Sequence, residues 1–195
     1  FYECAGLTMI DIPNGVTTIE DYTFFGCTSL VTLSLPDGVT NIGYAAFCEC
    51  AALPSLTLPD ALTTIEDYTF FGCSSLSSLT LPYGLTSIGE YAFWNCGTIK
   101  EVTSLGITPP TIDSTSFGDD TKANATLLVP DAALTAYESA DNWKDFANIK
   151  GFDPTAIKTA TDDATAAKSY TTNGAVAADG YKGIVISNGK KLIRR

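Results

Sequence analysis

A 23-residue repeat without insertion or deletion constrains this chain more than any other feature of its sequence. Four full copies follow one another at residues 7–29, 30–52, 53–75 and 76–98, and the same phases are apolar in each. In the fourth copy these phases are Leu76, Leu79, Leu81, Leu85, Ile88, Phe93 and Cys96. A unit this short cannot bury its own apolar face, so neighbouring copies must stack into a solenoid with one continuous core.

Each unit predicts two short strands and a tight segment. Leu79 and Leu81 have strand spacing, and Pro82 ends that strand because it has no N–H to donate to a sheet. A turn, a second extended piece and one helical or 3₁₀ turn carrying Phe and Cys complete the unit. Stacking at about 4.8 Å, the spacing of neighbouring strands, would align equal phases into columns. The predicted columns are Phe1, Phe24, Phe47, Phe70 and Phe93, and Cys4, Cys27, Cys50, Cys73 and Cys96.

The repeat resembles the BspA-like leucine-rich repeats, whose unit reads close to L-x-x-L-x-L-P-x-x-V-T-x-I-G-x-x-A-F-x-G-C. The resemblance covers residues 1–98, and its departures leave the core phases intact: Ala61, Glu20 and Glu66 stand in for Gly, and Glu49 displaces Gly before Cys50. This family is known chiefly from surface-exposed bacterial proteins that bind host or neighbouring-cell proteins. The resemblance therefore implies adhesion or protein recognition at the cell surface or outside the cell, without fixing a ligand.

We predict an α/β fold in which residues 1–98 form a leucine-rich-repeat solenoid of stacked short parallel strands. Residues 99–152 are predicted to be a C-terminal capping region with a strand at 127–130 and a helix running from an N-cap at Asp131 through Trp143. In this region Ile112 and Phe117 keep the Ile and Phe phases one residue late.

Residues 153–168 are predicted to be a linker, and residues 169–195 a small β-hairpin tail around Asn188-Gly189. The chain opens on Phe1 in the middle of a repeat, so we expect further repeats or a cap before it.

The cysteines are predicted to be free thiols. Five share one interior phase, where parallel Cβ vectors disfavour disulfides, and Cys48 is expected to be exposed at the phase of Phe25, Phe71 and Trp94. The chain has no His and no Cys-x-x-Cys pair, so we predict no metal site, no cofactor, no catalytic residue and no enzymatic activity.

Charge is distributed unevenly along the chain. Residues 1–99 contain no Lys or Arg but hold the acids Glu3, Asp11, Glu20, Asp21, Asp37, Glu49, Asp60, Glu66, Asp67 and Glu90. Nucleic acids and anionic lipid headgroups need a basic footprint, so the charge of this half of the chain argues against both as partners. No run of 18 apolar residues exists, and membrane insertion is not predicted.

Aromatic residues at phases that the core does not use are the best binding candidates. Tyr22, Tyr68 and Tyr91 share one phase, Phe25, Phe71 and Trp94 share another, and Tyr83 replaces Asp at the turn. We expect these residues to form an aromatic strip that binds a protein partner. Three alternatives stay open: a second apolar layer over the tight segments, an architectural spacer that presents a missing N-terminal domain, and a carbohydrate-binding surface.

Overall fold

The structure is a computed structural model that describes residues 1–154 in full and the backbone of residues 170–171, 183–187 and 190–194. The chain divides into two compact units, Phe1–Gly151 and Phe152–Arg195. All but the first two residues of the predicted linker, 153–168, lie outside the described residues.

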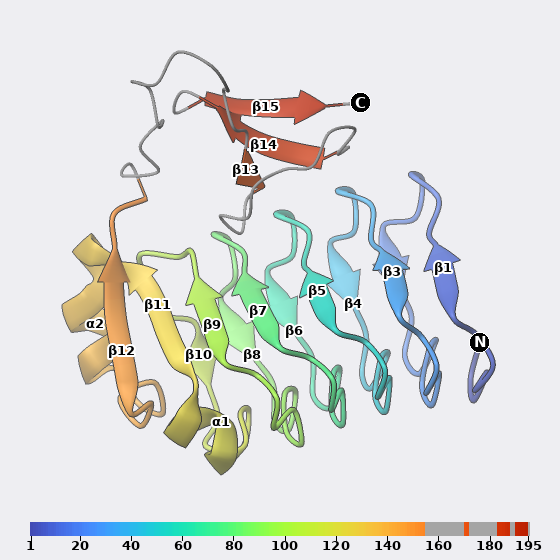
Figure 1. Ribbon diagram of the computed structural model, residues 1–195, viewed down its shortest axis with the longest axis horizontal. Coiled ribbons are helices and arrows are strands. Elements are labelled where there is room, and N and C mark those ends of the chain that lie inside the picture. The colour runs from blue at the N-terminus through green and yellow to red at the C-terminus, as the bar shows by residue number, and fades with distance from the viewer. Residues whose placement is uncertain (155–169, 172–182, 188–189, 195) are drawn as a thin grey trace. The chain divides into compact units, whose positions relative to one another are not determined.

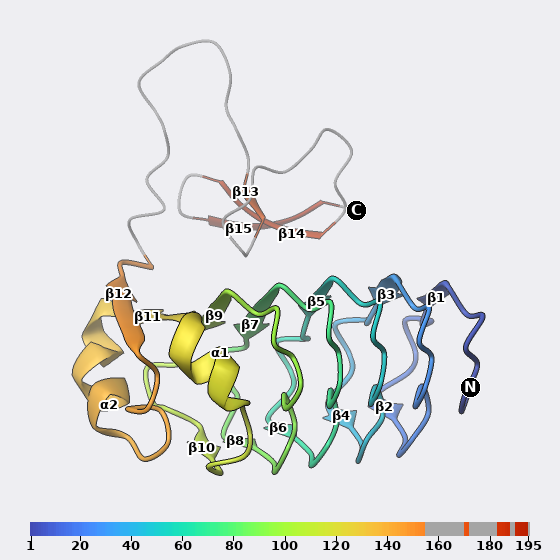
Figure 2. The ribbon, with the colours of Figure 1, turned by 60° about the horizontal axis from the view of Figure 1, so that its bottom comes forward.

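Two rows of short strands run along opposite sides of the first unit (Figures 1 and 2). Each coil contributes one strand to each row, and the pairs in both rows are parallel, with partners such as Leu56 and Leu79 one repeat apart. This arrangement confirms the predicted solenoid of stacked parallel strands. The first row is β1 (Met9–Asp11), β3 (Thr32–Ser34), β5 (Ser55–Thr57), β7 (Ser78–Leu81) and β9 (Glu101–Ser104). The second is β2 (Thr18–Ile19), β4 (Asn41–Ile42), β6 (Thr64–Ile65), β8 (Ser87–Ile88) and β10 (Thr111–Ile112).

A proline interrupts the first row between β3 and β5. The N–H groups of Val31, Ser77 and Lys100 donate to the carbonyl of the preceding coil at 2.9, 3.1 and 2.9 Å. Pro54 occupies the same phase and has no N–H. The first row divides here into a two-stranded sheet, β1-β3, and a five-stranded sheet in the order β12 (Asn148–Phe152), β11 (Thr126–Pro130), β9, β7 and β5. The second row divides at the same coil junction, into β2-β4 and β10-β8-β6.

The tight segments are hydrogen-bonded turns, and the predicted helical or 3₁₀ turn is wrong. Alternate N–H groups donate to the next coil, as from Tyr22 to the Tyr44 carbonyl at 3.0 Å and from Phe24 to the Ala46 carbonyl at 2.7 Å. Each segment also passes through the left-handed region, at Tyr22 (φ 56°) and again at Gly26 (φ 69°) in the first full coil. These residues break any helical run, and the bonds between coils make the tight segments a third backbone ladder.

The predicted phenylalanine column is the centre of the core. Ring centroids from Phe1 to Phe93 are 5.1–5.5 Å apart in consecutive coils, and the rings are close to parallel. Phe117 continues the column 5.2 Å from Phe93, and it packs against Trp143 and Phe146. The column therefore runs unbroken from the first coil into the C-terminal part of the unit.

The six cysteines are free, as predicted. Each interior thiol donates to the carbonyl of a phenylalanine in the preceding coil, for example Cys50 Sγ to Phe24 O at 3.3 Å and Cys96 Sγ to Phe70 O at 3.3 Å. Cys48 corrects the prediction, because it is buried with 5% of its surface exposed. Burial raises the pKa of the Cys48 thiol to about 11 and that of Cys50 to about 12.

The C-terminal part of the first unit has more helices and strands, and shorter ones, than the sequence predicts. The chain forms α1 (Asp119–Asn124), β11 (Thr126–Pro130), a 3₁₀ turn (Asp131–Ala133), α2 (Leu134–Ser139) and β12 (Asn148–Phe152). The predicted strand is confirmed as β11. The predicted helix through Trp143 is wrong: α2 ends at Ser139, because Ala140 is extended (ψ 140°). Asp131 is not its N-cap, since its carboxylate lies against Gly151 instead.

Buried polar contacts fix α2 and the turn after it to the last coils. Tyr137 Oη lies 2.7 Å from Ser104 Oγ and donates to the Gly106 carbonyl at 3.2 Å. Trp143 Nε1 donates to the Pro110 carbonyl at 2.7 Å. Pro109-Pro110 interrupts the repeat, and the Pro110 carbonyl is the hydrogen-bond acceptor that holds Trp143 in place.

The described strands of the second unit are antiparallel. β14 (Gly183–Ser187) pairs with β15 (Lys190–Arg194) and with β13 (Tyr170–Thr171). Ser187 pairs with Lys190, which leaves two residues for the connection. The predicted Asn188-Gly189 turn itself lies outside the described residues.

Acidic side chains and glycines alternate between coils with a 46-residue period. Asp21 lies against Gly43 and accepts the Tyr44 N–H at 2.8 Å, and Asp67 lies in the same way against Gly89. At the next junction the Glu49 side chain covers Gly72, where an added Cβ would lie 2.8 Å from the carboxylate carbon. Odd and even coils are therefore not equivalent. The contacting acidic side chain lies at one position in odd coils and at another in even coils, and the glycine that it contacts lies in the next coil.

Candidate functional site: an aromatic ladder

Four tyrosines form a continuous column along the tight segments. The ring centroids of Tyr22 and Tyr44 are 5.3 Å apart, those of Tyr44 and Tyr68 5.7 Å, and those of Tyr68 and Tyr91 4.9 Å. Three of the four, Tyr22, Tyr68 and Tyr91, are among the residues predicted for the strip. The structure therefore brings residues from four coils into one surface.

Tyr44 is the member that the sequence reasoning missed. The tyrosine phase of its coil is held by Ala45, so the column reads as interrupted there. Tyr44 stands one residue earlier, and its ring reaches both Tyr22 and Tyr68. A tyrosine beside the vacant phase was the signal that could have identified it.

A second set of rings lies beside this column and is interrupted at Cys48, which holds its phase in the coil between Phe25 and Phe71. Phe25, Phe71 and Trp94 each contact the tyrosine of their own coil, with centroids 6.0, 5.7 and 5.7 Å apart. Tyr2 begins this second set, stacked 5.1 Å from Phe25. We name the column and the second set together the aromatic ladder: Tyr2, Tyr22, Phe25, Tyr44, Tyr68, Phe71, Tyr91 and Trp94. Tyr83 is exposed at the turn between β7 and β8 and has no ring contact with any described residue, so it lies outside the ladder.

Three ladder tyrosines adopt a conformation that disfavours a side chain. The φ angles of Tyr22, Tyr68 and Tyr91 are 56°, 57° and 56°, in the left-handed region that glycine occupies most readily. Ala45 holds the same phase with a φ of 50°, so the conformation belongs to the tight segment of each coil. Here the bonds between tight segments impose the conformation, as from the Tyr68 N–H to the Glu90 carbonyl at 2.9 Å.

The ladder is half-covered by its own members. Tyr22 exposes 43% of its surface and Tyr44 37%, whereas Phe25, Phe71 and Trp94 are half-buried. The rings thus form a second apolar layer over the tight segments, and that layer keeps an accessible outer side. The rings share a surface, as expected for the strip, and they also cover the tight segments, as expected for the second apolar layer.

Carboxylates give the ladder a negative environment. The pKa of Tyr68 is raised above its usual value by partial desolvation, then by the neighbouring Tyr91 ring and the charges of Glu90 and Asp67. The pKa of Tyr2 is raised mainly by the adjacent charge of Glu3. These phenols therefore stay protonated at neutral pH and can donate hydrogen bonds.

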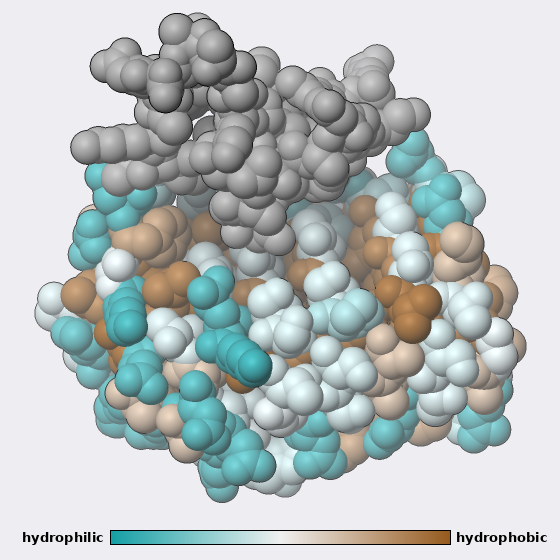
Figure 3. Space-filling model, in the orientation of Figure 1, coloured by the Kyte–Doolittle hydropathy of each residue, from teal (hydrophilic) through white to brown (hydrophobic). Residues whose placement is uncertain are grey.

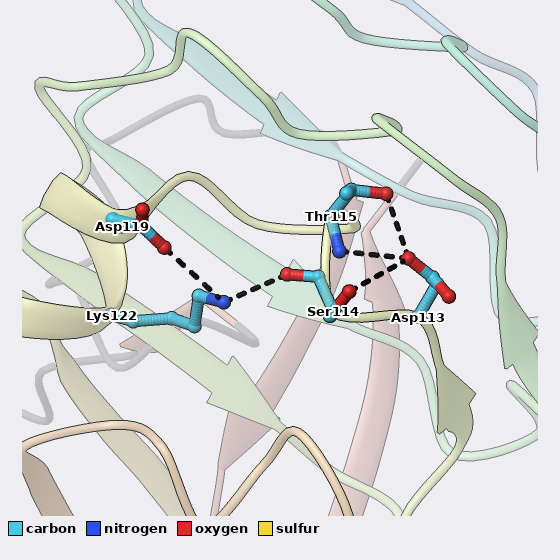
Figure 4. A network of polar contacts seen from close by, with 5 residues as sticks. All are labelled: Asp113, Ser114, Thr115, Asp119 and Lys122. Atoms are coloured by element: carbon cyan, nitrogen blue, oxygen red, sulfur yellow. Dashed lines mark hydrogen bonds and ion pairs between the residues drawn. The ribbon is translucent and has the colours of Figure 1, made fainter.

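A shallow groove of about 330 Å³ lies beside β6, β8 and β10. Its acidic lining comprises Glu66, Asp67, Glu90 and Asp113. Asp113 accepts hydrogen bonds from the Thr115 N–H at 2.9 Å and from its hydroxyl at 2.8 Å, which lowers the pKa of the carboxyl (Figure 4). The groove therefore has a negatively charged wall at neutral pH.

Lys122 lies close to this end of the groove, but its ammonium is already engaged. It donates to the Ser114 carbonyl at 2.8 Å and lies 3.6 Å from the Asp119 carboxylate (Figure 4). It thus belongs to the polar network that joins α1 to the loop after β10.

The outer face of the first strand row has a different character. Its exposed side chains are mainly small and hydroxylated, such as Ser55, Thr57 and Ser78, and Figure 3 shows the middle of this face in the white of intermediate hydropathy. Met9 and Val31 are exposed near the N-terminal end. Aromatic anchors are thus concentrated on the tight segments rather than on this sheet.

The stacked coils, parallel strands and repeated core phases define the chain as a leucine-rich-repeat solenoid. It matches the BspA type leucine rich repeat region over residues 1–124, in six copies. The chain belongs to this family. The match extends into the region predicted as the cap, where β9 and β10 form a further coil.

Two solved structures have the same fold. A leucine-rich repeat protein from Bacteroides ovatus is 39% identical, with a TM-score of 0.51, covering 54% of this chain and 27% of that protein. The T. pallidum leucine-rich repeat protein TpLRR is 24% identical, with a TM-score of 0.55, covering 79% of this chain and 61% of that one. The chain thus spans less than two thirds of either protein. Comparison with curated proteins finds no match.

Two further findings concern residues that the structure describes. Among them, no helix has the length and apolar character needed to cross a bilayer. Within the same residues, no three carboxylate or thiol side chains come together as a group that could hold a metal ion.

Proposed function

We propose that this chain is a non-catalytic recognition module that binds another protein through the aromatic ladder, at the bacterial cell surface or outside the cell. The observation that carries the proposal is the tyrosine column, in which rings from four consecutive coils lie in contact with their outer sides accessible. Tyrosine and tryptophan are the residues most often used as anchors in protein interfaces. Membership in a repeat family with exposed, variable surfaces supports the same function.

The ladder's rigidity favours recognition. Every tight segment from the first full coil to the fourth is bonded through its backbone to the next, so the rings are held in place before a partner arrives. Preorganised anchors lose little conformational entropy when they bind. An architectural spacer needs no such set of rings, and its exposed side chains would be scattered and polar.

Carbohydrate is a weaker candidate for the same surface. A sugar stacks on the open face of an aromatic ring, but Tyr68 and Tyr91 stack on each other 4.9 Å apart with an interplanar angle of 24°. The contact between these two rings therefore covers faces that a sugar would need. Ring edges and hydroxyls remain, which suits a protein partner better.

Selection from a random-peptide display library on the full chain tests the proposal. Selected peptides should bind the wild type and lose at least tenfold in affinity for Tyr22→Ser/Tyr44→Ser, which changes the two most exposed rings of the tyrosine column. Tyr83→Ser is the matched control, because Tyr83 is 62% exposed but lies outside the ladder. Circular dichroism confirms that each variant is folded.

Two results would refute the proposal. One is a selection that yields no binding peptide. The other is a set of peptides that bind the ladder variant and the wild type equally, because their site would then lie elsewhere.

A further inference from the structure

Carboxylates precede three of the ladder tyrosines in sequence, and the coils that carry the ladder hold no basic residue. Glu20 and Asp21 directly precede Tyr22, Glu66 and Asp67 precede Tyr68, and Glu90 precedes Tyr91. Residues 1–99 contain no Lys or Arg, so no basic side chain in the coils that carry the ladder can neutralise these groups. A partner must therefore accept an anionic surface as well as an apolar one.

The acidic groove extends this surface toward the last coils. Glu66, Asp67 and Glu90 line it and lie next in sequence to the ladder tyrosines, and Asp113 stands at its far side. Lys122, the nearby base, is bonded to Ser114 and Asp119. The groove therefore keeps the negative charge that a cationic side chain would seek.

Lysine and arginine match this combination within one side chain. Each has an apolar stem that can lie along ring edges and a cationic head that can reach a carboxylate. Four coils at about 4.8 Å span roughly 14 Å, which an extended segment of about five residues covers at about 3.3 Å per residue.

We propose that the aromatic ladder and its flanking carboxylates bind an extended, Arg- and Lys-rich segment of a partner protein. This inference rests on the proposed function and names the chemistry of the partner. The stems pack along Tyr22, Tyr44 and Tyr68, while the charged heads meet Glu20, Glu66 and Glu90. The protonated tyrosine hydroxyls donate to backbone carbonyls of the bound segment.

Tryptophan fluorescence provides a direct test with a defined probe. Trp94 is a half-exposed member of the ladder, whereas Trp143 is fully buried in the cap and supplies a constant background. The full chain is titrated with an alternating Arg-Ser decapeptide and, in parallel, with Glu-Ser and Gln-Ser decapeptides. Only the Arg-Ser peptide should give a saturable change in tryptophan fluorescence. Its affinity should fall at least tenfold between 50 and 500 mM salt, because salt screens the several charge pairs that hold it.

Two triple variants separate local recognition from general charge attraction. Glu20→Gln/Glu66→Gln/Glu90→Gln should weaken binding of the Arg-Ser peptide at least tenfold. The matched control, Asp11→Asn/Asp37→Asn/Glu101→Gln, removes the same number of exposed carboxylates away from the ladder and should change affinity less than twofold. Equal loss in both variants, or no saturable change with the Arg-Ser peptide, would overturn the inference.

The failures of the two proposals are distinguishable. Ladder-dependent peptides from the display selection that are acidic or neutral would overturn the basic partner and leave the ladder as a recognition site. Arg-Ser binding that is the same for the wild type and for Tyr22→Ser/Tyr44→Ser would overturn the basic partner alone. The proposed function fails only if the selected peptides also bind that variant and the wild type equally, or if none is selected.

Discussion

Replacing Tyr91 by glycine should leave a more stable protein than replacing it by alanine. Both substitutions remove the ring, which lies 4.9 Å from Tyr68 and 5.7 Å from Trp94. Aromatic pairs contribute about 0.5–1.5 kcal/mol each, so Tyr91→Ala should lower the free energy of unfolding by about 1–3 kcal/mol. The two variants then differ in how they tolerate a φ of 56° and in how flexible they leave the unfolded chain.

The difference can be worked out from the backbone alone. A left-handed conformation costs a residue with a Cβ roughly 1–2 kcal/mol, and glycine escapes this cost. Glycine also makes the unfolded chain more flexible, which costs about 0.4–1 kcal/mol relative to alanine. Taking the middle of each range, Tyr91→Gly should exceed Tyr91→Ala in stability by about 0.8 kcal/mol.

Thr63 supplies the matched control. It is exposed in the repeat and does not lie in the left-handed region, and its carbonyl is bonded to the next coil in both variants. There the order should reverse, with Thr63→Gly less stable than Thr63→Ala by about 0.4–1 kcal/mol. Equilibrium urea unfolding followed by circular dichroism, analysed with a common m value, measures both pairs. If alanine is the better residue at both positions, the left-handed conformation of Tyr91 is refuted.

Further predictions concern the core, a coil junction, the thiols and the domain division. Phe70→Ala removes a fully buried ring stacked on both sides and should cost about 3–5 kcal/mol in urea unfolding. Gly72→Ala should destabilise because its φ is 73° and the Glu49 carboxylate lies where the methyl would go; Glu49→Ala should restore part of the loss. Burial raises the pKa of Cys50 to about 12, so the folded chain retains a proton that the unfolded chain loses above about pH 9. Stability should hold below that pH and fall as pH rises toward 12. Deleting residues 154–195 should leave the thermal midpoint unchanged, if residues 99–152 close the stack by themselves as proposed.

Each of these outcomes can fail clearly. Phe1→Ala, at an exposed end of the same column, should cost little, and a loss equal to that of Phe70→Ala would contradict the stacked core. If the double variant Gly72→Ala/Glu49→Ala is no more stable than Gly72→Ala, the backbone angle alone accounts for the loss of stability at Gly72. A stability that is flat up to pH 12 would contradict buried neutral thiols. A large drop in midpoint after the deletion would show that the second unit is integral to the fold.

The fixed period allowed the solenoid and its core columns to be predicted, because equal phases must meet when identical units stack. The same logic explains the errors. Cys48 occupies a phase at which Phe25, Phe71 and Trp94 are half-buried, yet this smaller side chain is buried. Tyr44 was missed because a shift of one residue removes it from its phase, although its side chain is long enough to reach the column.

The tight segments could not be predicted from local sequence for a different reason. Their turns are selected by hydrogen bonds to the next coil, such as that from the Tyr68 N–H to the Glu90 carbonyl, which override the preference of Tyr68 for an ordinary backbone angle. The division of the last helix has a similar origin, since Trp143 is held by Pro110, more than thirty residues away. Tyr83 was included in the predicted strip because it is aromatic. It follows a strand of the first row, whereas the ladder lies on the tight segments.

The alternation of acids and glycines also bears on how such a chain can change in length. Removing one coil, residues 30–52, would bring the coil of Asp21 against that of Glu66, so a carboxylate would meet another carboxylate where it now finds Gly43. Removing two coils would place Asp21 opposite Gly89 and preserve the fit. The smallest segment that can be lost or duplicated while each acid still meets a glycine is thus a pair of repeats. Duplication or loss of gene segments should be tolerated in steps of 46 residues and selected against in steps of 23.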